Sequence, residues 1–203
     1  LDGELQQRAY DVIDKNNIKT SVKVDLSEKK IAVVGLDPHT GKVLVLLSYP
    51  SFDPADFEDS TVSTDHYFKD KAQPLFNRAL LGTYPPGSVF KPVVAAGALE
   101  EGAIEENETI TDNGFIQAGP IKFNNWFYTK YGKTDGQVDL RKGLQRSNDI
   151  YFYKVGEALT PEGIKKWAEK FGYGKKTGIS LDEETGVIPT DFWKRETIGE
   201  RWF

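Results

Sequence analysis

The stretch Tyr84-Pro85-Pro86-Gly87-Ser88-Val89-Phe90-Lys91-Pro92 decides how this chain folds and where its chemistry is expected. A rigid Pro-Pro-Gly turn precedes a serine, a lysine follows three residues later, and the apolar run from Pro92 to Gly102 predicts a buried helix. Residues three apart at a helix start lie on one face, so the Ser88 hydroxyl and the Lys91 amine are expected to be neighbours. Acyl-transfer enzymes use this arrangement when a lysine activates a serine nucleophile. The helix N-terminus adds N–H donors where an oxyanion would develop.

The bulk composition of the 203 residues fits one domain or a large fragment of one. A net charge of −5 argues against a nucleic-acid surface, which needs a basic patch. The absence of cysteine excludes disulfides, thiolate metal sites and a cysteine nucleophile. The two histidines, His39 and His66, lie in no motif that accompanies a serine nucleophile, which disfavours a Ser-His-Asp triad. No apolar run approaches the ~18–20 residues of a membrane span. Because the chain opens on Leu1 and contains no methionine, we expect it to be a fragment of a longer one.

Hydrophobic periodicity predicts the elements before the serine. Asp2 is expected to cap a helix over residues 3–16. Two apolar runs, residues 30–36 and 42–48, flank a turn sequence and predict a hairpin. Because both runs are almost entirely apolar, we expect the hairpin to be buried on both faces. The acidic residues 50–70 predict an irregular, exposed loop.

The second half of the chain is expected to be mainly helical, with no second domain. Loops and short strands are predicted over 105–137, followed by a helix over 138–156. A second helix is predicted from Thr160-Pro161-Glu162 to Gly172. Turns are predicted over 173–189, with no closing element before residue 203.

A second chemical signal is Ser147-Asn148-Asp149, which opens an aromatic segment. Alone, a serine followed two residues later by Asp or Asn predicts a helix cap or a turn. Here it follows Ser88 by 59 residues, so we expect it to be the second element of a serine acyltransferase.

Together these signals resemble the transpeptidase domain of class B penicillin-binding proteins, and the elongation-type penicillin-binding protein 2 subgroup most. The resemblance implies an α/β fold of the α+β kind, the penicillin-binding and serine β-lactamase-like fold, in which an antiparallel sheet carries helices on both faces beside a helical subdomain. The stretches that carry it span the chain in the family's order: residues 1–7, 36–41, 74–79, 84–92, 147–153, 171–174 and 177–179.

The resemblance also implies a role for four side chains. Ser88 would attack the carbonyl between the two terminal D-alanines of a peptidoglycan stem peptide, and an amine from a neighbouring stem would resolve the acyl-enzyme into a cross-link. Lys91 would take the serine proton, which requires a neutral amine that burial or nearby positive charge can favour. Ser147 would relay a proton toward the leaving group, and Asp149 would orient Lys91 and the substrate amide. β-Lactams would acylate Ser88 as mimics of the terminal dipeptide.

The family's third motif, Lys-Thr/Ser-Gly, lies on a strand that lines the site. Lys176-Thr177-Gly178 matches its letters, but it follows a helix end and precedes a turn-rich stretch, so we expect a structural segment there. Residues 1–203 are therefore expected to be a partial transpeptidase domain that lacks the C-terminal portion with the third motif. Some members carry zinc near the second motif on His and Cys ligands. Residues 105–146 contain neither, so no metal and no cofactor are expected.

Two further readings of the same motifs stay open. One is a hydrolase or β-lactam sensor of the same fold, although no water-activating carboxylate motif is visible. The other is a non-catalytic scaffold fragment. The resemblance implies a catalytic domain outside the inner or plasma membrane, tethered by an N-terminal anchor absent from this chain. It also implies a lipid-linked glycan polymerase and other elongation-machinery proteins as partners.

Some side chains admit both a structural and a functional interpretation. The four aromatic residues between 126 and 131 are expected to anchor loops by packing, with a peptide groove as the alternative. Arg78 fits either a brace for the loop that leads to the serine or a surface position.

Overall fold

The structure is a computed structural model that describes residues 1–15 and 29–200. The chain divides into two compact units. The first comprises residues 1–83 and 178–184, and the second comprises residues 84–177 and those from Thr185 on. In the described residues, no helix is both long and apolar enough to cross a membrane.

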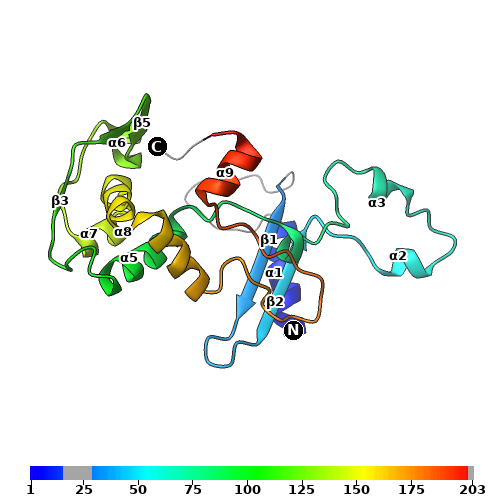
Figure 1. The fold of residues 1–203 in the computed structure, drawn as a ribbon. Helices are drawn as coiled ribbons and strands as arrows, with labels where there is room; N and C mark the ends of the chain where they lie inside the picture. The colour runs from blue at the N-terminus through cyan, green and yellow to red at the C-terminus, as the bar shows by residue number, and fades with distance from the viewer. Residues whose placement is uncertain (16–28, 201–203) are drawn as a thin grey trace. The chain divides into compact units, whose positions relative to one another are not determined.

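The first unit is built on a helix packed against a hairpin (Figure 1). Helix α1 (Gly3–Asp14) begins where the Asp2 carboxylate accepts a hydrogen bond from the Leu5 N–H at 3.0 Å. Strands β1 (Ile31–Leu36) and β2 (Val43–Tyr49) pair antiparallel. This confirms the predicted hairpin and the predicted helix up to Asp14, and residue 16 lies outside the described residues. The buried core residues of this unit are Ile13, Val45 and Leu47.

The prediction that the hairpin is buried on both faces is wrong for the described residues. Strand β1 alternates between half-buried and exposed positions, and Val34 and Leu36 are 51% and 57% exposed. The reason is that α1 packs on one face of the hairpin. Alternate side chains of a strand point to opposite faces, so Val34 and Leu36 face away from α1. On that face α4 contacts both strands but leaves these two side chains exposed.

The acidic segment after β2 is exposed, as expected, but it contains two short helices, α2 (Ala55–Glu58) and α3 (Asp65–Lys69). It is followed by α4 (Arg78–Leu81). The Arg78 side chain is 3% exposed and donates hydrogen bonds to the carbonyls of Gln73, Phe76 and Ala72. The alternative of a surface position is therefore wrong. Arg78 holds the loop that precedes α4, and none of these hydrogen bonds reaches the residues between α4 and Ser88.

The second unit is mainly helical. A 3₁₀ turn, η1 (Gly87–Phe90), continues directly into α5 (Lys91–Glu100), which packs along α8 (Asp149–Lys170). Helix α5 is buried on most sides, as predicted. The buried residues of this core are Val94, Ala95, Ala98, Ile104, Val138, Leu140, Tyr151, Phe152, Val155 and Leu159.

Short strands lie between α5 and α8, as expected for residues 105–137, but this range also contains a short helix that was not predicted. Strand β3 (Ile110–Asp112) pairs with β6 (Gly136–Val138), and β4 (Phe115–Ala118) pairs with β5 (Ile121–Asn124). Helix α6 (Trp126–Tyr131) follows β5. The described strands therefore form three separate two-stranded antiparallel sheets.

Two helix predictions need correction. The single helix expected over 138–156 is divided into α7 (Leu140–Gln145) and α8, because Ser147 adopts φ +49° between them. The predicted break before Pro161 is confirmed, since Thr160 has φ +67° inside α8. The chain also carries a final helix that was not predicted, α9 (Asp191–Ile198), which starts where Thr190 Oγ1 accepts from the Trp193 N–H at 3.1 Å.

Candidate active site

Ser88 and Lys91 lie on one short helical turn. Gly87 opens it with φ +57°, a conformation that glycine adopts without a steric penalty. Ser88 follows within η1, and Lys91 is the first residue of α5. Side chains three apart in a 3₁₀ turn eclipse one another, so the two lie on the same side of the helix. Ser88 is exposed and Lys91 is partly buried, and the Ser88 hydroxyl makes no hydrogen bond with another described residue.

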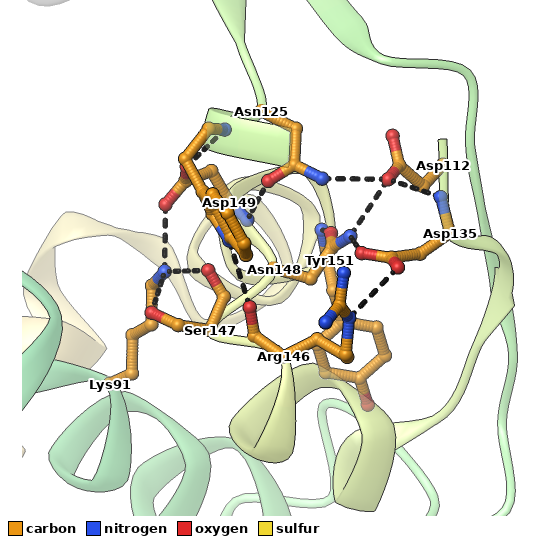
Figure 2. A network of polar contacts seen from close by, with 10 residues as sticks. Lys91, Asp112, Asn125, Asp135, Arg146, Ser147, Asn148, Asp149 and Tyr151 are labelled. Atoms are coloured by element: carbon orange, nitrogen blue, oxygen red, sulfur yellow. Dashed lines mark hydrogen bonds and ion pairs between the residues drawn. The ribbon is translucent and has the colours of Figure 1, made fainter. Parts of the chain in front are cut away.

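The Lys91 amine joins this turn to the second motif (Figure 2). Its Nζ donates to the Ser147 carbonyl at 2.7 Å, to Ser147 Oγ at 3.1 Å and to Asp149 Oδ1 at 2.7 Å. Three acceptors match the three hydrogens of an ammonium group. The Lys91 and Asp149 side chains are 13% and 24% exposed, so the ion pair is well shielded from water. The charged group that contacts Lys91 is therefore the negative Asp149 carboxylate. The sequence alone also allows a positive neighbour, which would favour the neutral amine.

The Ser147 segment has a fixed shape because both of its ends are hydrogen-bonded. The Ser147 N–H donates to the Leu144 carbonyl at 3.1 Å, and the Asn148 N–H donates to the Gly143 carbonyl at 2.9 Å. Asn148 Oδ1 then caps α8 by accepting from the Tyr151 N–H at 2.8 Å. Gly143 lets α7 approach α8 closely, since a Cβ there would lie 2.7 Å from the Tyr151 ring.

Asp149 is held from the other side by the start of α6. Its Oδ2 accepts from the Trp126 N–H at 3.1 Å, and its own N–H donates to Asn125 Oδ1 at 3.2 Å. The Trp126 indole N–H donates to the Arg146 carbonyl at 2.9 Å. Trp126 therefore anchors the loop, which confirms the structural interpretation for this residue.

A buried carboxylate, Asp112, lies beside Asn125 and Asn148, on the side away from Lys91 (Figure 2). Asp112 is 1% exposed, and its Oδ2 accepts from Asn125 Nδ2 and Asn148 Nδ2, both at 2.8 Å, and from the Asp135 N–H at 3.0 Å. Its Oδ1 accepts from the Gly114 N–H at 2.6 Å. Burial by itself would raise the pKa of Asp112, but the hydrogen bonds from Asp135, Gly114, Asn148 and Asn125 outweigh it, and the pKa lies below its usual value.

The structure brings three of the four predicted site residues into contact, namely Lys91, Ser147 and Asp149, and it places Ser88 one turn from Lys91. Sequence reasoning missed Asp112 and Asn125, because an isolated Asp or Asn in a loop has no spacing that marks it. The segment Lys176-Thr177-Gly178 is exposed and irregular rather than part of a strand, as expected.

A family model now adds to this geometry. The model for the penicillin binding protein transpeptidase domain matches residues 31–201. The chain belongs to this penicillin-binding protein family. The expected family and its α/β fold class are therefore confirmed.

Three relatives illustrate the similarity. The chain is 37% identical over 204 aligned residues to the peptidoglycan D,D-transpeptidase MrdA of Escherichia coli, an alignment that covers 97% of this chain and 32% of the relative. Penicillin-binding protein 2 of Helicobacter pylori superposes with a TM-score of 0.82 at 34% identity, over 100% of this chain and 36% of that one, and its complex with MreC gives 0.81 at 32% identity, over 98% and 35%. Penicillin-binding protein A of M. tuberculosis, solved as an imipenem acyl-enzyme, gives 0.69 at 31% identity, over 79% and 39%. The chain thus spans about a third of the length of its curated relatives.

Proposed function

We propose that this chain carries the serine nucleophile and the proton-transfer residues of a D,D-transpeptidase that cross-links peptidoglycan stem peptides. The observation that carries the proposal is the contact of Lys91 Nζ with both Ser147 and Asp149, one helical turn from an exposed Ser88. The name of the E. coli relative, peptidoglycan D,D-transpeptidase, supports the substrate class.

Ser88 is the proposed nucleophile. Its Oγ attacks the carbonyl carbon of the penultimate D-alanine, and its proton passes to Lys91 in the neutral form. The oxyanion that develops faces the Ser88 N–H, which lies in the first turn of the helix where N–H groups have no intrahelical partner. The scissile C–N bond then breaks, and D-alanine leaves with the proton that it has received.

Ser147 is the proposed route for that proton. Its Oγ lies 3.1 Å from Lys91 Nζ, so it can accept a proton from the lysine and pass its own to the leaving nitrogen. An amine of a neighbouring stem then attacks the acyl-enzyme, and the same groups work in reverse. Asp149 fixes the direction of Lys91 through the 2.7 Å contact of Nζ with Oδ1, a hydrogen bond that the neutral amine can also donate.

The further assignments follow the family. The imipenem acyl-enzyme of the M. tuberculosis relative supports β-lactams as inhibitors that acylate Ser88. The H. pylori complex with MreC supports elongation-machinery proteins as partners, and a lipid-linked glycan polymerase is a further proposed partner. Since peptidoglycan lies outside the cell membrane, we place the catalytic domain on the periplasmic or extracellular side.

Intact-mass spectrometry of the intact protein after incubation with a penicillin tests the proposal, with Ser88→Ala as the control. A persistent single adduct on the wild type, absent from Ser88→Ala, is expected, together with D-alanine release from a pentapeptide stem when an amine acceptor is present. An adduct that is lost within minutes indicates a β-lactamase, and an adduct without D-alanine release indicates a sensor. No adduct on a folded protein overturns the nucleophile and favours the scaffold.

A further inference from the structure

The second motif lies on a buried layer of polar side chains (Figure 2). Asp112, Asn125 and Asn148 are each at most 1% exposed, although they come from three separate segments of the chain. Buried polar groups remain in a folded protein when they are hydrogen-bonded, and these three bond mainly to one another and to the motif. The layer therefore has a defined arrangement of donors and acceptors.

The charge of Asp112 fixes that arrangement. A carboxylate only accepts hydrogen bonds, so both asparagines must turn their NH₂ groups toward it. Asn125 is then left with its oxygen facing the Asp149 N–H at 3.2 Å, and Asn148 with its oxygen facing the Tyr151 N–H at 2.8 Å. Both of these N–H groups belong to the first turn of α8. One buried carboxylate thus sets the position of the helix start that carries Asp149.

The same layer reaches the other end of the motif. Asn148 Nδ2 also donates to Asp135 Oδ2 at 3.0 Å, and Asp135 Oδ1 accepts from Arg146 Nε at 3.0 Å. Arg146 and Asn148, the residues on either side of Ser147, are therefore both hydrogen-bonded to Asp135. Ser147 itself has an unfavourable positive φ.

We infer that Asp112 and Asn125 are positioning residues, which hold Ser147 and Asp149 at the distances that Lys91 needs. Among the described residues, neither side chain is hydrogen-bonded to Ser88, Lys91 or Ser147. They act through the Asp149 backbone and through Asn148. The inference rests on the proposed function. A displacement of about 1 Å in such a site can slow a reaction by about 100-fold, so the effect should appear in the rate of acylation.

Asn125→Asp is the sharpest test because it changes one NH₂ into an oxygen without changing shape. At neutral pH two carboxylate oxygens would then face each other at the 2.8 Å now spanned by the Asn125–Asp112 hydrogen bond, and they repel. At lower pH the two carboxyls share a proton, which restores the donor. We expect penicillin acylation about 10- to 100-fold slower than wild type at pH 8, with the ratio to wild type recovering toward pH 5. The buffer contains a chelator, so that no cation bridges the two carboxylates.

Two further variants make the outcome decisive. Leu159→Ala removes a buried core side chain away from this layer, and we expect a lower melting temperature with an acylation rate like wild type. Asn125→Ala removes the link without adding charge, and we expect slow acylation whose ratio to wild type does not change with pH. It also replaces Asn125→Asp as the test if that variant fails to fold at pH 8.

The result that overturns the inference is a folded Asn125→Asp or Asn125→Ala protein that acylates at the wild-type rate at every pH. The inference is also overturned if the Asn125 variants melt at a lower temperature, as Leu159→Ala does, but keep the wild-type acylation rate. The layer would then contribute only to stability. If wild type itself forms no adduct, the proposed function fails instead, and melting temperatures alone then report on the layer.

Discussion

Gly97→Ala should destabilise the protein, although alanine is the better helix former. Gly97 lies within α5, where it faces α8, the helix whose first residue is Asp149. A Cβ at this position would lie 2.7 Å and 2.8 Å from Cγ and Cδ1 of Trp167, and 3.0 Å from Cδ2 of Leu159. Distances this short require one helix to move, because the nearest atoms belong to a rigid ring.

The Trp167 ring has little room to yield. Its indole N–H donates to Glu101 Oε1 at 2.8 Å, and the Lys166 amine donates to the same oxygen at 2.7 Å. Overpacking a well-filled contact typically costs about 1–3 kcal/mol, and we take the upper end here because the ring is held. Replacing glycine by alanine in a helix returns about 1 kcal/mol. The net expectation is a loss of about 2 kcal/mol.

Gly156→Ala is the matched control. Gly156 lies within α8, and its Cβ would meet only Ile164 Cδ1 at 3.7 Å, an ordinary contact. The helix-propensity gain then acts alone, so we expect a stabilisation of about 0.5–1 kcal/mol. The two substitutions are chemically identical and differ only in what the added methyl group meets.

Thermal unfolding of both variants and wild type, under one buffer and scan rate, measures the difference. We expect Gly97→Ala to melt below wild type and Gly156→Ala to melt above it. A Gly97→Ala protein as stable as Gly156→Ala would refute the close helix contact from which the estimate is made.

Three further outcomes are expected. Lys91→Ala should slow penicillin acylation by about 10²- to 10⁴-fold, the usual contribution of a general base, and an unchanged rate in the intact-mass assay would remove Lys91 from the proton transfer. Because hydrogen bonds lower the pKa of Asp112, its contribution to stability should be complete above about pH 3.9, its value in an unfolded chain, and should be lost as the pH falls through the folded pKa. Melting temperatures from pH 5 down to pH 2.5 should show that loss in wild type, and Asp112→Asn should lack this component; equal slopes would contradict it. Thr190→Ala should remove the cap of α9 and cost about 1 kcal/mol by urea unfolding, whereas no change would mean that the 3.1 Å hydrogen bond to Trp193 contributes nothing.

Local patterns in the sequence determined most of the elements and the candidate chemistry. The helix after Asp2, the hairpin, the Ser88 turn and the break before Pro161 each depend on residues that are neighbours in the chain. Proline, glycine and capping side chains restrict the backbone wherever they occur, so such features can be predicted without knowing what packs against them. The family resemblance was carried by these same short stretches.

Only the tertiary structure decided how the motifs meet and what supports them. The break at Ser147 overrides a helical pattern, because hydrogen bonds of the segment offset the cost of a positive φ. They join the Ser147 carbonyl to Lys91, the Asn148 side chain to Asp112 and the Arg146 carbonyl to Trp126. Asp112 and Asn125 lie 35 and 22 residues before Ser147 in the sequence, and no periodicity links them to it. Whether the face of β1 that carries Val34 and Leu36 is buried depends on which element packs against it. The hydrophobicity of the strand does not identify that element.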